Sequence, residues 1–99
     1  MSKKVKAFNN VLELIGNTPL VKLNKIVEEI PGDFYAKVEA FNPGHSNKDR
    51  IALHIIETAE KKGLLKPGST IIETTSGNTG FSLSMVSIIK GYNCILAVS

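Results

Sequence analysis

The strongest constraint on the fold is an alternation of strand-like and helix-like segments that begins at residue 34. Alternating apolar and polar residues predict a strand over 34–40, and β-branched or apolar runs predict buried strands over 70–75 and 94–98. Apolar residues at helical spacing predict one helix from about 46 to 62 and a second from about 81 to 90. This order favours an α/β fold with parallel strands, right-handed crossovers and flanking helices.

The segments before residue 34 are shorter. Residues 1–10 are interpreted as an N-terminal leader, a helical turn is expected near Val11, and a brief strand is expected over 20–23. Two helices are few for three or four strands, because a buried parallel sheet needs helices on both of its faces. We therefore interpret residues 11–99 as the front part of a longer domain, apparently truncated, with a partial parallel sheet.

Composition excludes several classes of protein. The formal net charge of the 99-residue chain is +3, and three of its lysines lie in the leader (Lys3, Lys4 and Lys6), so the remainder offers no basic face for nucleic acid. A single cysteine, Cys94, excludes an internal disulfide and a cysteine cluster for zinc. The apolar runs are far shorter than the roughly 20 residues of a membrane span. We expect a cytoplasmic protein with no nucleic-acid, membrane or metal partner.

The segment Thr75-Ser76-Gly77-Asn78-Thr79-Gly80 connects a predicted strand to a predicted helix. Backbone N–H groups at a helix N-terminus favour anions, because unsatisfied donors and the helix dipole point the same way. The glycines allow close approach of a ligand, and the hydroxyl and amide side chains add donors. The segment has neither the Gly-x-x-x-x-Gly-Lys spacing of a phosphate-binding loop nor the Gly-x-Gly-x-x-Gly spacing of a dinucleotide-binding loop. The residues indicate an anion site of unspecified kind or an ordinary capped turn.

Lys48 is the candidate nucleophile. The spacing from Ser46 to Asp49 resembles a capping box and predicts that Lys48 is the second residue of a helix, where a positive charge is disfavoured. Arg50 adds repulsion, so the neutral amine is favoured, which is the form that attacks a carbonyl to make an imine. A solvated surface lysine is the alternative, and Asp49 is expected to act at the helix start.

The other polar candidates predict structural roles. His45 precedes the first long helix and could contact a ligand, although a capping or solvent-facing role is favoured, and His54 is expected at the surface. Cys94 is expected to be a small buried residue. Lys37 and Glu39 lie on one face of a predicted strand and are expected to pair across strands.

Three groups of motifs occur in order along the chain. They are NTPLV at 17–21, KVE at 37–39 with FNPGHSNKDR at 41–50, and ETTSGNTG at 73–80. Together they closely resemble the start of cysteine synthases and cystathionine β-synthases. These are pyridoxal-phosphate enzymes of the tryptophan-synthase-β-like fold, also called fold type II. The resemblance covers nearly the whole chain from about Val11.

The resemblance implies functional roles for particular residues. Lys48 is implied to hold pyridoxal phosphate as a Schiff base, and Asn78 to lie near the phenolate oxygen of the cofactor. The substrate α-carboxylate is implied to bind the loop formed by Thr75, Ser76, Gly77, Asn78 and Thr79. In the family, the groups that hold the cofactor phosphate and the pyridine nitrogen come later in the chain. We therefore expect the 99 residues alone to retain the cofactor weakly and to lack useful catalysis.

The resemblance also implies a reaction. An activated serine such as O-acetylserine loses its α-proton to Lys48 and then its β-substituent, and sulfide adds to the aminoacrylate intermediate to form cysteine, or a thiol adds in its place. Cystathionine β-synthase activity, from serine and homocysteine, is an alternative that these residues do not separate. A non-catalytic, truncated α/β fragment is the other alternative, and a nucleotide-binding module is a distant third. The full-length form is implied to be a homodimer.

Overall fold

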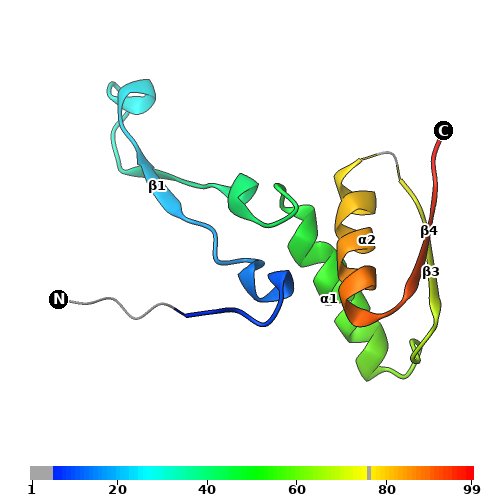
Figure 1. Cartoon of the computed structure of the whole chain (residues 1–99). Coiled ribbons are helices and arrows are strands. Elements are labelled where there is room, and N and C mark those ends of the chain that lie inside the picture. Colours follow the sequence, from blue (N-terminus) through cyan, green and yellow to red (C-terminus); the bar gives the residue numbers. More distant parts are fainter. Residues whose placement is uncertain (1–5, 76) are drawn as a thin grey trace.

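The computed structural model describes residues 6–75 and 77–99 (Figure 1). Four strands and two long helices follow one another along the chain, with three short 3-10 helices among them. The strands are β1 (Leu20–Leu23), β2 (Phe34–Lys37), β3 (Thr70–Thr74) and β4 (Asn93–Ala97), and the long helices are α1 (Lys48–Lys61) and α2 (Asn78–Lys90). The 3-10 helices span Val11–Leu14, Lys25–Val27 and Glu39–Phe41.

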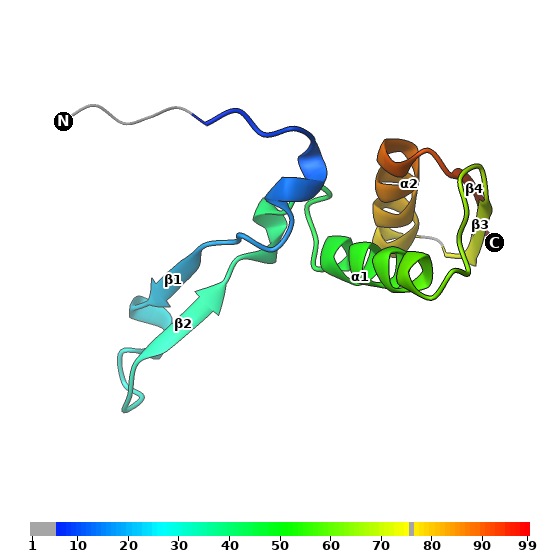
Figure 2. The same cartoon turned by 90° about the horizontal axis from the view of Figure 1, so that it is seen from below.

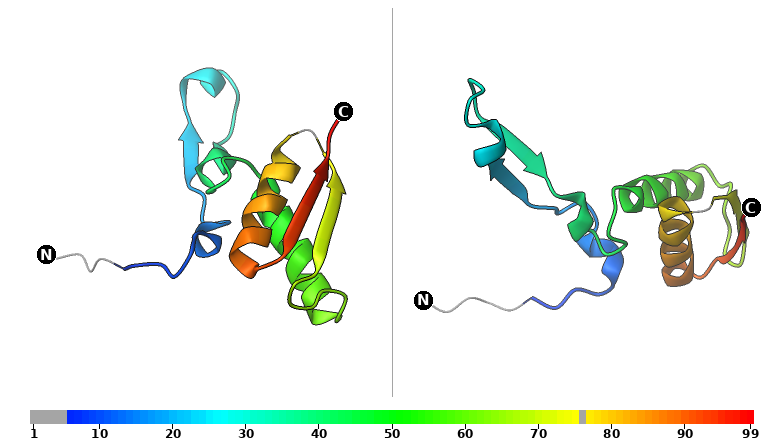
Figure 3. Two further views of the ribbon diagram at one scale, coloured as in Figure 1. Left: turned by 45° about the vertical axis from the view of Figure 1, so that its right-hand side comes forward. Right: turned by 90° about the horizontal axis from the view of Figure 1, so that it is seen from above.

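The strands form two separate two-stranded sheets. β1 and β2 pair antiparallel, with Leu20 opposite Lys37, and this hairpin extends away from the two long helices (Figures 1 and 3). β3 and β4 pair in parallel, with Thr70 opposite Asn93. The prediction that the strand near residue 34 joins the parallel sheet is therefore wrong. Its nearest strand along the chain is β1, and closing a short loop costs less entropy than reaching a distant partner.

The unit β3–α2–β4 is the crossover that the sequence predicted, and α1 packs beside it. Both long helices lie on the same side of the β3–β4 sheet (Figure 2). The buried core between them consists of Ala52 and Ile56 from α1 with Leu83 and Val86 from α2. Each helix thus uses one stripe of apolar residues to cover the other, as amphipathic helices do.

Burial of the strands and of α2 differs from the prediction. The strands expected to be buried are largely exposed, with Ile72 of β3 69% and Ile95 of β4 54% exposed. The apolar side of α2 that carries Phe81 and Ile88 also faces outward, at 56% and 76% exposure. A run of apolar residues indicates that a segment can be buried on both faces, but here α1 and α2 cover only one face of the sheet.

Element boundaries shifted in two places. β2 ends at Lys37, and a 3-10 turn over Glu39–Phe41 replaces the end of the strand predicted over 34–40. α2 begins at Asn78, three residues before the expected start, so Asn78 and Thr79 belong to its first turn. Helix starts are difficult to locate from periodicity because the first turn need not be apolar.

A polar cluster joins the C-terminal ends of the two helices. Lys90 Nζ on α2 donates to Glu60 on α1 at 2.8 Å, and the Tyr92 hydroxyl donates to the same carboxylate at 2.6 Å. Hydrogen bonds from Lys90, and then from Tyr92, lower the pKa of Glu60, while the carboxylate raises the pKa of Tyr92. This cluster fixes the helices at the end opposite to the one that carries Lys48.

Candidate active site

Lys48 is the first residue of α1, one position earlier in the helix than predicted. The N-cap is Asn47, and the backbone N–H of Lys48 donates to Ser46 Oγ at 3.2 Å. The side chain of Lys48 is part-buried, and within residues 6–75 and 77–99 its ammonium makes no ion pair within 4.0 Å. Its amine is therefore not committed to a neighbouring carboxylate.

The loop after β3 folds around one hydroxyl. Thr75 Oγ1 accepts the backbone N–H groups of Gly77 at 3.3 Å and Gly80 at 3.2 Å. A Cβ added at Gly80 would come within 2.5 Å of Thr75 Cγ2, so the close turn requires glycine there. The backbone N–H groups of Asn78 and Thr79 meet no acceptor in the described part of the chain. Within the described residues they are unpaired donors at a helix N-terminus, as an anion site requires.

Both predicted groups lie at one end of the helix pair. α1 and α2 begin at the same end of the molecule, where β3 also ends (Figure 1). The connection is a hydrogen bond from Ser82 Oγ in α2 to Asp49 Oδ1 in α1, 2.6 Å long. The structure therefore brings Lys48 and the loop of Thr75, Gly77, Asn78 and Thr79 to one end. Ser76 lies outside the described residues.

Asp49 does not close the predicted capping box. Its carboxylate is fully buried and accepts the backbone N–H of Gly44 at 2.5 Å, in addition to the Ser82 hydroxyl. A Cβ at Gly44 would collide with this carboxylate. Asp49 lies in the first turn of α1, as expected, but its partners are in the preceding loop and in another helix rather than at the N-cap.

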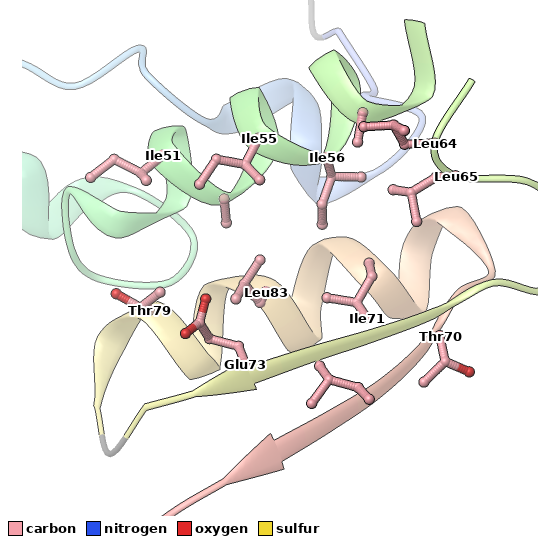
Figure 4. Close-up of a pocket in the computed structure, with 13 residues that line it drawn as sticks. Ile51, Ile55, Ile56, Leu64, Leu65, Thr70, Ile71, Glu73, Thr79 and Leu83 are labelled. Atoms are coloured by element: carbon pink, nitrogen blue, oxygen red, sulfur yellow. The ribbon is translucent and has the colours of Figure 1, made fainter. Parts of the chain in front are cut away.

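An open groove runs between α1 and β3, with a cavity volume of about 270 Å³. Its walls are mostly apolar, with Ile51 and Ile55 on α1 and Ile71 on β3. Figure 4 shows Thr79 and Glu73 at the end of the groove near the start of α2. Thr79 thus borders both the groove and the open amides of the helix.

The loop that leads to Lys48 is held by a buried asparagine, Asn42, which is 1% exposed. Its amide nitrogen donates to the carbonyl of Ser46 at 2.9 Å and to that of Glu39 at 3.0 Å. Its side-chain oxygen accepts the N–H of Gly16 at 2.8 Å. Asn42 belongs to the FNPGHSNKDR motif, and these side-chain hydrogen bonds connect the loop before Lys48 to Gly16 and to the turn at Glu39.

Glu39 and Arg50 form an ion pair next to this loop. Arg50 donates to both carboxylate oxygens of Glu39, at 2.7 and 3.0 Å, and the Thr18 hydroxyl donates at 2.5 Å. The hydrogen bond from Arg50, and then that from Thr18, hold the pKa of Glu39 at about 2, below its ordinary 4.5. Lys37 donates to the Thr18 carbonyl, and Glu39 lies in a 3-10 turn and pairs with Arg50 of α1. The prediction that these two charged side chains pair with residues of a neighbouring strand is therefore wrong.

This pKa predicts acid-dependent stability. Because the folded-state pKa of Glu39 lies below its unfolded value, its contribution is complete above pH about 4.5 and is lost as the pH falls toward 2. We expect the difference in urea midpoint between wild type and Glu39→Gln to shrink over that range. Glu28→Gln, an exposed change on the hairpin, should show no such trend. A Glu39→Gln difference that is independent of pH would contradict the assignment.

The remaining candidates have surface or packing positions. His45 is exposed with a left-handed φ of 62°, and its Nδ1 lies 3.4 Å from the Ala40 carbonyl oxygen. His54 is exposed, as expected, and Cys94 is part-buried rather than fully buried. Among the described residues, no three His, Cys, Asp or Glu side chains gather as metal ligands, and no helix is long and apolar enough to cross a membrane.

The fold and site define an α/β protein with a lysine at the start of one helix and a polar glycine-containing loop at the start of its neighbour. A protein-family model with the description "pyridoxal-phosphate dependent enzyme" matches residues 11–99 of the chain. The chain belongs to this family of pyridoxal-phosphate-dependent enzymes, as the sequence motifs predicted.

Individual relatives agree with this assignment. The chain is 54% identical over 95 residues to a cystathionine β-synthase of Apis mellifera, covering 94% of this chain and 19% of that protein. It is 50% identical over 93 residues to a cysteine synthase of Staphylococcus aureus, and the match covers 94% of this chain and 30% of that protein. The crystal structure of an O-ureido-L-serine synthase matches with a TM-score of 0.86 and 49% identity, and the match covers 94% of this chain and 29% of that one. The chain therefore spans less than a third of these relatives.

The residues present fit the family's cofactor. Pyridoxal phosphate carries an aldehyde that an amine must reach. Lys48 is part-exposed, and its amine makes no ion pair among the described residues. A Cβ added at Gly77 would meet nothing within 4 Å, so there is open space beside this loop glycine. Lys48 and the loop can therefore hold the reactive end of the cofactor and an amino-acid carboxylate.

Proposed function

We propose that the natural gene product carrying this chain is a cysteine synthase, which replaces the β-substituent of O-acetylserine or another activated serine with sulfide. The observation that carries this proposal is the position of Lys48 at the same end as the α2 N-terminus, where Asp49 and Ser82 link the two helices. The similarity to the Staphylococcus aureus cysteine synthase supports it.

The residues have the following roles in this proposal. Lys48 Nζ holds the cofactor and then moves the proton from Cα of the substrate. The bound pyridoxal phosphate supplies an electron sink for Cα. Thr75 Oγ1 accepts two backbone N–H groups and keeps its own proton, which it donates to the substrate carboxylate. The backbone N–H groups of Asn78 and Thr79 would add two donors, and the Asn78 side-chain amide would offer a donor to the phenolate oxygen of the cofactor.

Cystathionine β-synthase activity is the second candidate, and the 54% identity to the Apis mellifera enzyme favours it. The two activities differ in leaving group and incoming thiol. Turnover of O-acetylserine with sulfide is therefore compared with turnover of serine with homocysteine, using the same purified protein. The faster reaction identifies the activity, and equal inactivity with both pairs contradicts both candidates.

Borohydride reduction tests the covalent role of Lys48. The natural gene product is purified, reduced and analysed by intact mass and peptide mapping, and we expect a pyridoxyl group on the peptide that contains Lys48. Lys61→Ala, at the other end of α1, should be labelled like wild type, whereas Lys48→Ala should not. An unmodified product of 10.7 kDa that ends at Ser99 would contradict the proposal and support the non-catalytic fragment.

A further inference from the structure

A fully buried carboxylate connects three segments of the candidate site. Asp49 accepts the N–H of Gly44 in the loop before Lys48, at 2.5 Å, and the hydroxyl of Ser82 in α2, at 2.6 Å. Asp49 itself follows Lys48 directly in the first turn of α1. One side chain thus joins the loop before the lysine, the helix α1 that carries the lysine, and the helix α2 that begins at Asn78.

Stability alone does not require this arrangement. Asp49 and Ser82 are both fully buried, and the adjoining core is formed by apolar residues such as Ala52 and Leu83. Burying a carboxylate is costly, and well-packed apolar residues of similar volume often stabilise such a position as well or better. Unlike an apolar side chain, the carboxylate makes directional hydrogen bonds, and each of its oxygens accepts one donor from a different segment.

We propose that Asp49 and Ser82 are positioning residues that set the place of Lys48 relative to the start of α2. The inference rests on the proposed function, in which Lys48 moves a proton of a substrate held at that helix start. Catalytic groups must be held closely, because a displacement of about 1 Å can cost on the order of 100-fold in rate. The hydrogen bond between Ser82 and Asp49 restricts such a displacement between α1 and α2.

The chain offers a matched control in Ser87. It lies on the same helix as Ser82 and is also fully buried. Unlike Ser82 Oγ, its Oγ has no hydrogen-bond partner among residues 6–75 and 77–99. Ser82→Ala and Ser87→Ala therefore remove the same atom from the same helix at equal burial, but only the first removes a link to α1.

The experiment uses the natural gene product loaded with pyridoxal phosphate. For Ser82→Ala we expect unchanged borohydride labelling of Lys48, a kcat roughly 10- to 100-fold lower, and a KM within a few-fold of wild type. Ser87→Ala should resemble wild type in all three measurements. A purely structural role would lower thermal stability and leave the kcat of the folded enzyme unchanged.

Changes at Asp49 separate geometry from charge. Asp49→Asn can turn its carbonyl oxygen to the Gly44 N–H and its amide group to Ser82 Oγ, so it should recover most of the kcat that Asp49→Ala loses. Hydrogen exchange provides a readout without activity. The Gly44 amide should exchange faster in Asp49→Ala than in Asp49→Asn, because only the alanine removes its acceptor.

Several results would overturn the positioning role. They are a normal kcat in Ser82→Ala, equal losses in Ser82→Ala and Ser87→Ala, and an Asp49→Asn enzyme as slow as Asp49→Ala. Failure of the proposed function is seen separately, as wild-type protein that carries no reducible cofactor on Lys48. That result would overturn both statements, whereas a labelled and active wild type with insensitive Ser82 would overturn only the positioning role.

Discussion

Replacing Lys48 with alanine should nearly abolish turnover of the natural gene product while leaving its fold intact. Lys48 is the first residue of α1, is part-buried, and forms no ion pair among the described residues, so truncating it breaks no such interaction. In the proposed function it both holds the cofactor and moves the α-proton. Loss of a proton-transfer group alone typically costs about 10²–10⁴-fold, so kcat should fall by at least that factor.

The matched comparison is Lys61→Ala, because Lys61 closes the same helix at its opposite end and is exposed. Steady-state rates, visible absorbance of bound cofactor and thermal midpoints are measured on wild type, Lys48→Ala and Lys61→Ala. We expect the thermal midpoints of the variants to lie close together when no cofactor is added. A Lys48→Ala enzyme with wild-type turnover would rule out the proposed role, and an equally slow Lys61→Ala enzyme would show that the loss is not specific.

Local patterns predicted the elements that carry the site. The strand over 20–23 has the predicted bounds, and the crossover from β3 through α2 to β4 is present in parallel register. Lys48 and the Thr75–Thr79 segment were singled out as candidates because turn residues next to a helical pattern have strong short-range signals, although both helices begin at other residues than predicted. In a β-α-β unit, the loop after the strand and the start of the next helix share one edge of the sheet, which explains why the sequence indicated a candidate anion site there.

Long-range partners could not be predicted in the same way. Alternation over 34–40 indicates a strand but does not say which strand it joins, and β2 paired with β1. The contacts of Asp49 with Ser82, and of Asn42 with Gly16, join residues 33 and 26 positions apart. Their side chains resemble ordinary capping and turn residues in the sequence. The packing of α1 on α2 brings Asp49 to Ser82, and the contact between the loop before α1 and the turn at Gly16 brings Asn42 to its partner.

Replacing Gly44 with alanine should destabilise the protein more than most single changes at a loop. Gly44 is buried, and a Cβ at this position would collide with the Asp49 carboxylate. Relief requires the loop or the carboxylate to move, which disturbs the hydrogen bonds to Gly44 N–H and to Ser82. Overpacking of a buried site costs about 1–3 kcal/mol, and urea unfolding of the natural gene product measures it.

A double-mutant cycle identifies the cause of this loss. If the collision with the carboxylate is responsible, Gly44→Ala should cost much less in an Asp49→Ala background, where the colliding atoms are absent. Gly77→Ala controls for a loop glycine that gains a methyl group, because a Cβ there meets nothing within 4 Å. An equal cost of Gly44→Ala in both backgrounds would mean that backbone restriction, not contact with Asp49, destabilises the loop. A strongly coupled cycle would instead show that the loop before Lys48 and the buried carboxylate are packed as one unit.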